Sequence, residues 1–234
     1  KEGMLVEGFE EDCTMATYYN PSYYPQIIER LSYKKEVDWI QYRIKANQEI
    51  PEKILRINNL IKEKYNLRIV EGLSAKQIAK RYGHKLFDTL NEAFSHLFGY
   101  VPLNEKQVQF YIDMYFPFLN KKLLCLIVDE NDEIAAFGVS MPSLTEALRK
   151  SKGKLFPFGW YHIFKALKSK TYEAFDFLII AVRPDYQDRG LNAVIIADQH
   201  PYFVKYGIQH IETTAIMETN FKNLNHWEAF PHKY

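Results

Sequence analysis

The residues with the clearest chemical potential follow a short apolar run late in the chain. This run, 177–182, has the length of a strand buried on both faces, and Pro184 stops its backbone from pairing further. A polar turn with Gly190 follows and leads into helical spacing, in which Pro201 perturbs the last turns. Glycine lets backbone N–H groups approach a phosphate, and the helix dipole favours its negative charge. The sequence therefore predicts a phosphate-binding turn at the start of a helix.

This order of strand, turn and helix resembles the pyrophosphate-loop signature of the GCN5-related N-acetyltransferase superfamily. The matching segment runs from Val182 to Asn192. The core of the superfamily's signature is Gln/Arg-x-x-Gly-x-Gly/Ala, and Gln187, Gly190 and Asn192 stand at its three named positions. Asn192 departs from the pattern, because the superfamily usually has glycine or alanine there. A side chain at this position would crowd the pyrophosphate or cap the helix, since asparagine is a good N-cap. The alternative is an ordinary strand-to-helix turn of some other α/β protein.

The resemblance implies that an amine attacks the thioester of acyl-coenzyme A, either acetyl-coenzyme A or another acyl form. The pantetheine would pair like an extra strand with residues 180–183, and the pyrophosphate would lie on the turn. The implied cofactor-binding residues are Ala181, Val182, Arg183, Gln187, Asp188, Arg189, Gly190, Leu191 and Asn192.

Three carboxylates are candidates for the catalytic base that this chemistry requires. An amine acceptor is protonated at neutral pH and needs a base within reach, directly or through water. Asp176 is the first candidate, because it begins the central strand, where histone-acetylating members of the superfamily carry a glutamate. Glu212 and Glu218, on the next expected strand, are the alternatives. Each of the three could instead be a solvated carboxylate at a sheet edge or end.

Trp227 departs from the superfamily at the position of a tyrosine that often protonates the leaving thiolate. Its indole N–H is not a practical acid. The thiolate would then leave unaided or take a proton from another donor, such as His226 or Tyr202. A non-catalytic acyl-coenzyme A-binding or assembly module remains an alternative to an N-acetyltransferase, as does an aminoacyl or fatty-acyl transferase with two such halves.

The elements around the turn follow the superfamily's order, which is strand, two helices, hairpin, strand, turn, helix and strand. This order predicts a mixed α/β fold with a mixed sheet. The expected strands are 67–70, 123–128, 134–140, 177–182 and 211–220, and the expected helices are 51–65, one capped by Ser74 and running to Leu97, 104–119, 144–149 and 224–230.

The first 47 residues repeat part of the far end of the chain. Residues 15–20 resemble a strand that ends in Asn20, and a short helix at 26–31 and a strand at 37–44 follow. Aligning Asn20 with Asn220 predicts a tandem repeat and a fragment of a longer gene product. The expected domains are a remnant of a first half at 1–47, a linker helix at 48–65, and a second domain at 66–234 that lacks its last strands. Alternatively, the match is chance, and strands from 1–47 complete a single sheet.

An insertion at 142–170 combines an aromatic run at 155–164 with basic residues. The run could form a lid or the wall of an acyl or acceptor pocket, but a satellite core beneath a long connection is the favoured interpretation. The basic residues could meet a nucleotide phosphate, although a solvated face is favoured. They are Arg149, Lys150, Lys152, Lys154, Lys165, Lys168 and Lys170.

The composition sets limits on the partners. Thirty basic and 29 acidic residues give a net charge of +1, so neither nucleic acid nor a membrane surface is expected as a partner. No apolar run approaches membrane-spanning length, and the two cysteines and seven histidines have no metal-binding spacing. We therefore expect a cytoplasmic protein without a metal, acting on a small-molecule or peptide amine. The sequence does not indicate the oligomeric state or the acyl length.

Overall fold

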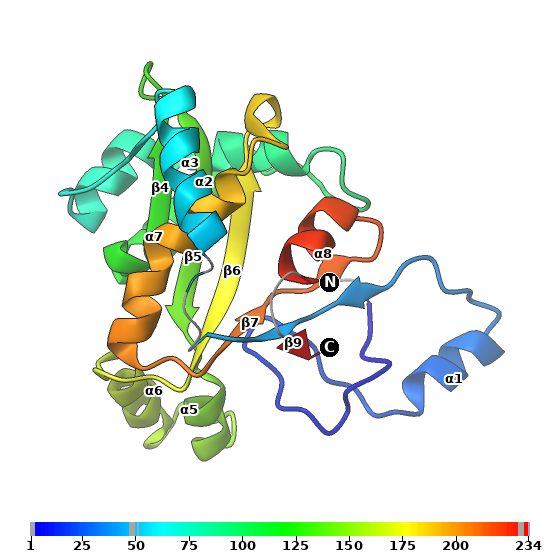
Figure 1. Cartoon of the computed structure of the whole chain (residues 1–234). Coiled ribbons are helices and arrows are strands. Elements are labelled where there is room, and N and C mark those ends of the chain that lie inside the picture. Colours follow the sequence, from blue (N-terminus) through cyan, green and yellow to red (C-terminus); the bar gives the residue numbers. More distant parts are fainter. Residues whose placement is uncertain (1–2, 47–49, 51, 229–231, 234) are drawn as a thin grey trace. The chain divides into compact units, whose positions relative to one another are not determined.

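The computed structural model describes residues 3–46, 50, 52–228 and 232–233, and it has a mixed α/β fold (Figure 1). The chain divides into two compact units that are interleaved along the sequence. The first unit comprises 1–47, 142–178 and 206–234, and the second comprises 48–141 and 179–205. The strand β6 (Ala174–Val182) contributes its first half to the first unit and its second half to the second.

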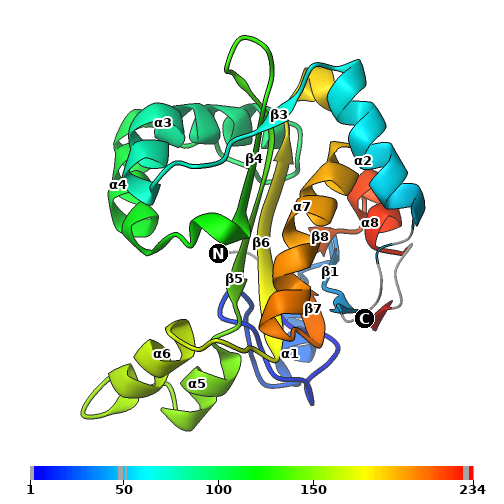
Figure 2. The ribbon, with the colours of Figure 1, turned by 60° about the vertical axis from the view of Figure 1, so that its left-hand side comes forward.

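A sheet with helices on both faces forms the second unit. Its other elements are α2 (Glu52–Lys64), β3 (Arg68–Ile69), α3 (Ala75–Phe94), α4 (Glu105–Tyr115), the 3-10 turns η1 (Phe116–Phe118) and η2 (Lys121–Leu123), β4 (Leu124–Val128), β5 (Ile134–Pro142), η3 (Pro184–Tyr186) and α7 (Leu191–Tyr206). β4 pairs antiparallel with β3 and with β5, so the predicted hairpin is confirmed. Figure 2 shows α3 and α4 on one face of β4 and β5, and α2 with α7 on the other.

The two helices that cover one face begin at capping boxes. The Ser74 side chain accepts a hydrogen bond from the Gln77 backbone, and the Gln77 side chain accepts one from the Ser74 backbone. Asn104 and Gln107 form the same reciprocal pair at the start of α4. These caps satisfy backbone N–H groups that a helix start leaves without partners. The apolar stripes that follow pack into one core with β4 and β5, which includes Ile78, Tyr82, Leu86, Val108, Ile112, Leu126 and Phe137.

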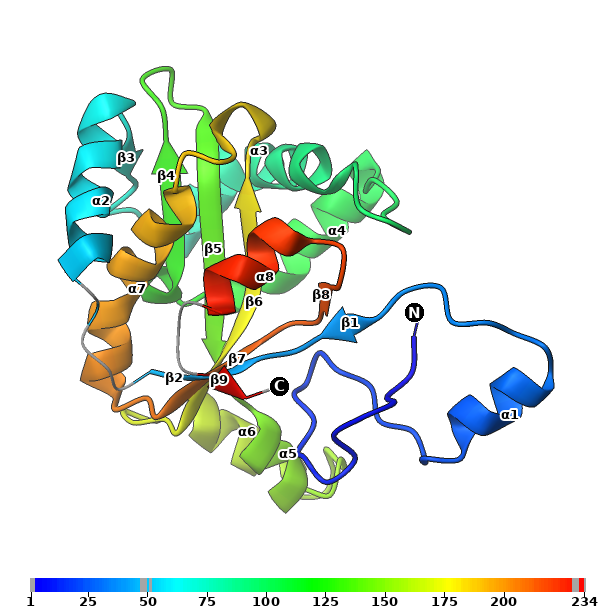
Figure 3. The same ribbon diagram turned by 45° about the vertical axis from the view of Figure 1, so that its right-hand side comes forward.

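The first unit contains the other half of the sheet. Its remaining elements are α1 (Tyr24–Arg30), β1 (Trp39–Ile40), β2 (Arg43–Lys45), α5 (Thr145–Lys150), α6 (Gly159–Leu167), β7 (His210–Thr213), β8 (Ile216–Met217), α8 (Phe221–Glu228) and β9 (His232–Lys233). The first half of β6 pairs parallel with β7, β7 pairs antiparallel with β2, and β2 pairs antiparallel with β9. β1 and β8 form a separate two-stranded sheet (Figure 3). Strands from the first 47 residues thus join strands near residue 215, while the predicted domain boundaries at 47 and 65 stay predictions.

Three predicted strands differ from the structure. Residues 15–20 are not a strand, because Thr17 closes a turn onto the Thr14 carbonyl and Asn20 bonds the Leu5 backbone at 2.7 Å and 3.1 Å. The segment 37–44 forms the short strands β1 and β2, and 211–220 forms β7 and β8. At 15–20, side-chain hydrogen bonds to backbone groups thus take the place of the hydrogen bonds that a strand would make with a neighbouring strand.

The aromatic run of the insertion is exposed, so the expected satellite core is wrong. Within α6 only Gly159 is buried, and Phe156 and Phe158 in the preceding loop are 74% and 72% exposed. The predicted helix at 144–149 is confirmed as α5.

None of the described helices is both long and apolar enough to cross a membrane.

Candidate active site

The predicted turn joins β6 to α7 in the second unit. The strand ends at Val182, the 3-10 turn η3 follows, and α7 begins at Leu191. Asp188 and Gly190 have left-handed backbones, with φ of +61° and +80°. Left-handed residues between right-handed or extended ones turn successive N–H groups toward one concave side, where they can hold an anion. The structure thus places two left-handed residues in the expected turn, and anion binding there stays a prediction.

Gly190 is held against α2 within this unit. A Cβ atom at this position would lie 2.8 Å from Ile61 Cδ1 and 3.7 Å from Ile57 Cγ2. Such a separation forces a neighbour to move, and the positive φ would add strain to any other residue. Glycine is therefore required here by its backbone and by the close approach of α2, which the sequence did not indicate.

An arginine of the turn stacks on two tyrosine rings. The Arg189 guanidinium carbon lies 4.8 Å from the centroid of the Tyr65 ring and 5.1 Å from that of Tyr186. The two rings meet edge to face, with centroids 6.4 Å apart. Cation–π contacts of this kind hold a guanidinium in place without neutralising it. The turn therefore carries a positioned positive charge.

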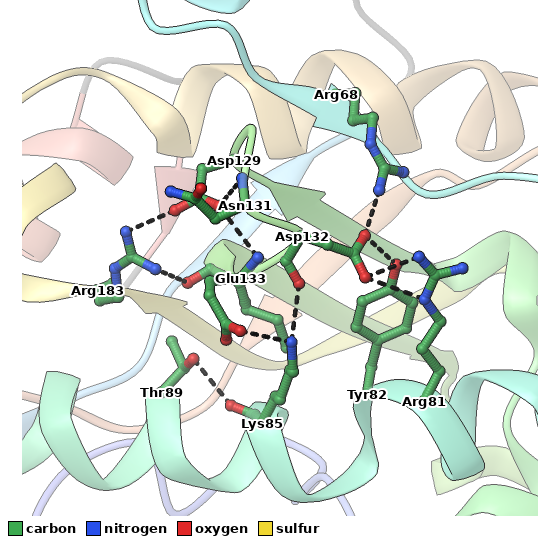
Figure 4. A network of polar contacts seen from close by, with 11 residues as sticks. Arg68, Arg81, Tyr82, Lys85, Thr89, Asp129, Asn131, Asp132, Glu133 and Arg183 are labelled. Carbon is green, nitrogen blue, oxygen red and sulfur yellow. Dashed lines mark hydrogen bonds and ion pairs between the residues drawn. The ribbon is translucent and has the colours of Figure 1, made fainter.

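Arg183 ties the turn to the β4–β5 hairpin (Figure 4). Its guanidinium donates to Asp129 Oδ2 at 2.9 Å, to the Ile134 carbonyl at 3.2 Å and to Asp185 Oδ1 at 2.7 Å. The hydrogen bond to Asp185 is the main cause of the raised pKa of Arg183, which burial opposes. Its backbone N–H donates to the Ala135 carbonyl at 2.9 Å. Because its donors are engaged within the chain, Arg183 positions the turn, and a ligand contact from it stays a prediction.

The tip of the same hairpin is fixed by α3. Asp132 accepts hydrogen bonds from Arg68, Arg81 and the Tyr82 hydroxyl, and Lys85 donates to Glu133 at 2.6 Å (Figure 4). Burial raises the pKa of Asp132, but the hydrogen bonds from Tyr82 and Arg81 outweigh it, so the pKa falls below its usual value. The hairpin to which Arg183 is anchored is therefore itself rigidly held.

The second half of β6 has no pairing strand on one edge among the described residues. The recorded pairs between β6 and β7 end at Phe177 and Thr213, so among the described residues 179–182 have no partner strand on that side. Thr214 adds hydrogen bonds only to the Phe177 and Leu178 carbonyls, both at 3.3 Å. An extended ligand with amide groups can pair with such an edge, as an added strand does.

A β-bulge lies in the same strand. The Arg183 N–H donates to the Ala135 carbonyl, and the Ser143 N–H donates to the Ala174 carbonyl, both at 2.9 Å. The step from Ala135 to Ser143 is eight residues, whereas the step from Ala174 to Arg183 is nine. β6 therefore contains one extra residue, which leaves backbone groups outside the ladder.

Asn192 does not cap α7, so that interpretation is wrong. It lies inside the first turn, after the helix has begun at Leu191, and its Oδ1 is buried without a hydrogen-bond partner among the described residues. The alternative, that its side chain would crowd a pyrophosphate on the turn, stays a prediction.

In the first unit, Asp176 and Glu212 are register partners on β6 and β7. Side chains directly opposite one another lie on the same face of a sheet. The row continues through the register partners Arg43 on β2 and Lys233 on β9. Two carboxylates are therefore followed by two cations across four strands, a pattern that only the strand register reveals.

Glu212 is neutralised within this row. It accepts from Arg43 Nε at 2.5 Å, and His210 Nε2 lies 3.6 Å from the same oxygen. Glu11 in turn accepts from both Arg43 and Lys233. Burial lowers the pKa of His210 in spite of the neighbouring carboxylate. Glu212 is thus committed to ion pairing.

Asp176 stays the titratable member of the row. Its residue is 3% exposed, and its Oδ1 has no hydrogen-bond partner among the described residues. Burial raises its pKa to about 6, the Ser143 hydroxyl opposes the shift, and the charge of Glu212 adds to it. A carboxylate with this pKa is ionised at neutral pH yet basic enough to take a proton.

The other predicted residues lie apart from this row or outside its chemistry. Glu218 accepts from the Asp38 N–H at 3.0 Å and so holds the segment after β8. Trp227 is 3% exposed, donates to Asn223 at 3.1 Å and packs on Phe177, so it fills the core. The His226 side chain lies outside the described residues. Tyr202 lines a separate pocket of the second unit with Asp198.

Sequence reasoning missed Arg43 and His210 as neighbours of Glu212. The spacing of His210 and Glu212 places both on one face of a strand, which was an available signal. Arg43 lies about 170 residues away in sequence, and nothing local connects it to Glu212.

Comparison with known proteins adds two distant relatives. The chain is 26% identical to "Protein YghO" of Escherichia coli K12 over 236 residues, which covers 94% of this chain and 56% of the relative. It is 24% identical over 226 residues to "Bacterial ceramide synthase" of Caulobacter vibrioides, which covers 93% of this chain and 57% of the relative. The chain thus spans about half the length of these curated relatives. No protein-family model matches it.

Solved structures show the fold. A GCN5-related N-acetyltransferase from Sphaerobacter thermophilus aligns over 89% of this chain and 52% of its own, with a TM-score of 0.54 and 12% identity. The GCN5-related glucosamine N-acetyltransferase region of a fungal GH3 β-N-acetylglucosaminidase aligns over 89% of this chain and 21% of its own, with a TM-score of 0.54 and 11% identity. The fold that the resemblance implied is confirmed: the chain has the fold of GCN5-related N-acetyltransferases.

Proposed function

We propose that this chain catalyses transfer of an acyl group from acyl-coenzyme A to an amine. The fold supports acyl transfer in general, and Asp176 is the observation that carries the chemistry. It is a buried carboxylate with a pKa of about 6 and an oxygen without a partner among the described residues.

The turn fits the pyrophosphate of acyl-coenzyme A. The left-handed Asp188 and Gly190 turn backbone N–H groups to one side, and Arg189 is held by two rings without losing its charge. Backbone amides and one positioned guanidinium bind a phosphate without a large net charge. The backbone edge at 179–182 would accept the amide groups of the pantetheine.

Asp176 would act as the general base. It takes a proton from the ammonium form of the acceptor, and the free amine attacks the thioester carbonyl carbon. A carbon–nitrogen bond forms, the attacking nitrogen gives its second proton to water, the carbon–sulfur bond breaks, and the thiolate leaves and takes its proton from solvent. Solvent is the proposed proton source because Trp227 is buried and its N–H is committed to Asn223.

We propose a long-chain amino alcohol as the acceptor and a fatty acyl group as the donor. Ceramide formation joins a fatty acid to such an amine through an amide. The similarity to a protein named bacterial ceramide synthase, across 93% of this chain, supports this substrate class.

Calorimetric titration with palmitoyl-coenzyme A tests the binding site. We expect Arg189→Ala to weaken binding about tenfold, because a charge-assisted contact to phosphate is lost. The matched control is Lys76→Ala, an exposed charge at the start of α3 in the same unit, which should bind as the wild type does. Equal affinity of all three proteins would contradict the placement of the pyrophosphate.

Release of coenzyme A thiol in the presence of sphinganine tests the reaction. We expect release from the wild type, with kcat/KM rising through about pH 6, and no measurable release from Asp176→Asn. Donor binding without thiol release would favour the non-catalytic module, which the burial of Trp227 in place of a proton donor also favours.

A further inference from the structure

The insertion of the first unit forms a helical hairpin with an exposed aromatic surface. We call residues 145–170 the aromatic hairpin; it contains α5, the loop 151–158, α6 and three following residues. Its exposed apolar side chains are Leu155 (51%), Phe156 (74%), Phe158 (72%), Trp160 (49%), Tyr161 (52%), Phe164 (50%) and Leu167 (45%).

The backbone of the hairpin holds these side chains outward. The Gly153 N–H donates to the Leu148 carbonyl at 3.0 Å, and the Trp160 N–H donates to the Leu155 carbonyl at 2.9 Å. The Trp160 indole donates to the Pro157 carbonyl at 3.0 Å. A Cβ at Gly159 would lie 1.7 Å from the Lys154 carbonyl oxygen, so the loop closes tightly on α6. The exposed rings therefore belong to a folded loop.

The charge of the hairpin differs from that of the whole chain. The aromatic hairpin contains seven lysines and arginines and one acidic residue, Glu146, whereas the chain has 30 basic and 29 acidic residues. Arg149 pairs with Asp12, and Lys150 pairs with Glu146. The other basic residues of the hairpin are exposed lysines, namely Lys152, Lys154, Lys165, Lys168 and Lys170. Lys168 Nζ lies 4.2 Å from the centroid of the Phe164 ring. Lysines and aromatic residues thus alternate along this exposed segment, and the contact of Lys168 with Phe164 brings one of each together.

The exposed apolar side chains of α1 and α4 have charges of both signs near them in the sequence. Ile27 is followed by Glu29 and Arg30 on α1, and Phe110 stands between Lys106 and Asp113 on α4. Apolar surface mixed with both signs of charge has no preference for an anionic partner. Aromatic side chains surrounded by lysines match the interface of a bilayer with anionic headgroups, because the rings enter the acyl boundary and the ammonium groups meet the phosphates.

We propose that the aromatic hairpin docks the protein on the anionic surface of a lipid bilayer. This departs from the expectation of no membrane partner, which rested on the net charge of the whole chain. The proposal rests on the hairpin alone and is independent of the proposed acyl transfer.

Sedimentation of the whole chain with vesicles tests the proposal. One set contains phosphatidylcholine alone, and the other contains equal parts of phosphatidylcholine and phosphatidylglycerol. We expect binding to the anionic vesicles to be at least about tenfold tighter, and to weaken when NaCl rises to about 0.5 M. A blue shift of tryptophan fluorescence should accompany binding, since Trp160 enters the interface.

Two double variants separate the contributions of rings and charges. The first double variant combines Phe156→Ser with Phe158→Ser, and the second combines Lys152→Glu with Lys154→Glu. Each should weaken vesicle binding about tenfold or more, and each changes only exposed loop residues. The control pair is Tyr23→Ser with Ile27→Ser on α1, which should bind vesicles as the wild type does. Circular dichroism verifies that each variant is folded.

Three outcomes would overturn the proposal. In the first, the folded wild type does not bind anionic vesicles. In the second, the hairpin variants bind these vesicles as tightly as the wild type. In the third, the protein forms a stable dimer that the Phe156 and Phe158 substitutions dissociate, and it does not bind vesicles. None depends on catalysis, so inactivity in the thiol-release assay would leave the docking proposal standing.

Discussion

Asp176 is buried beside a second carboxylate, an arrangement that disfavours its charged form. Arg43 neutralises Glu212 and leaves Asp176 without a cation of its own in the row. The folded state therefore keeps the Asp176 proton up to about pH 6, whereas the unfolded chain releases it near the usual value of 3.8. Stability from this group is present below the unfolded pKa and is lost as the pH rises through the folded pKa.

We expect Asp176→Asn to stabilise the protein at about pH 8 by up to about 3 kcal/mol, because asparagine keeps the volume without the buried charge. The gain should shrink below about pH 6 and vanish near pH 4. Urea unfolding at the two ends of this range measures it. The control is Glu10→Gln, an exposed carboxylate of the same unit, which should change stability equally at both pH values. A gain that does not vary with pH would show that Asp176 does not titrate as described.

Gly190 combines a positive φ with a close neighbour, and the two costs can be separated. Gly72 has nearly the same φ, +78°, but nothing within 4 Å of an added Cβ, whereas Gly190 would place its Cβ 2.8 Å from Ile61. We expect Gly72→Ala to lower the free energy of unfolding by about 1 kcal/mol and Gly190→Ala by about 2–4 kcal/mol. Chemical denaturation measures both variants.

The Ile61→Ala background completes this test. Removing the side chain that the new methyl group meets should reduce the cost of Gly190→Ala to about that of Gly72→Ala. If Gly190→Ala costs the same with and without Ile61, then α2 does not pack on the turn as described.

At the scale of elements, the β4–β5 hairpin shows how a polar tip is fixed by a helix. Asp132 has a φ of +62° and accepts hydrogen bonds from Arg81 and the buried Tyr82, in addition to Arg68. Its pKa is lowered because these hydrogen bonds and charges outweigh burial. The stability from its charge is therefore present above the unfolded pKa and is lost as the pH falls through the folded pKa.

Asp132→Asn tests this arrangement, because asparagine also tolerates a left-handed backbone. We expect the free energy of unfolding at about pH 7 to fall by about 1–2 kcal/mol, from the loss of charge-assisted hydrogen bonds. The difference should shrink in acid and disappear once the pH has fallen through the lowered folded pKa of Asp132. Asp88→Asn, an exposed position on α3, is the control and should be neutral. A loss that persists unchanged in acid would mean that the charge of Asp132 contributes nothing.

The elements that were predicted from the sequence are those that depend on residues close together in the chain. The capping boxes at Ser74 and Asn104 depend on residues three positions apart, and the hairpin on a polar turn between two apolar runs. The turn between β6 and α7 was predictable for the same reason, because the strand, the glycine and the helix follow one another directly in the sequence. The predicted strand at 15–20 failed, because a side chain at Asn20 can bond backbone 15 residues away.

The parts of the candidate site that depend on strand register were not predictable. The row from Asp176 to Lys233 requires the pairing of four strands drawn from three parts of the chain. The bulge in β6 appears only when two hydrogen bonds to neighbouring residues are compared. A one-residue change in register moves every side chain to the other face, so composition and periodicity cannot supply this information.

At the scale of the whole molecule, the balance of charge hides a local excess. Because the net charge is only +1, an anionic surface was not expected as a partner from the sequence. Residues 147–172 nevertheless carry seven basic residues and no acidic ones. Interactions between exposed charges fade over about 10 Å in physiological salt, so a partner responds to the local surface rather than to the total. Net charge is therefore a poor guide when charged residues are segregated along the sequence.

The interleaving of the two units predicts a single cooperative unfolding transition. The chain passes between the units at 47, 141, 178 and 205, and β6 contributes to both. Unfolding either unit also unfolds its half of β6, which continues into the half that belongs to the other unit. The tryptophans Trp39, Trp160 and Trp227 all belong to the first unit, so their fluorescence reports the unfolding of that unit alone.

We expect Leu126→Ala, in the core of the second unit, to shift the fluorescence transition of the first unit. Leu126 is 1% exposed, and its truncation should cost about 2–5 kcal/mol. If the chain unfolds as one, the midpoint from fluorescence and the midpoint from far-ultraviolet circular dichroism fall together. Val101→Ala is the control, because Val101 is 77% exposed in the same unit and should move neither midpoint. An unchanged fluorescence midpoint beside a lowered circular dichroism midpoint would mean that the units unfold independently, because the shared strand then fails to couple them.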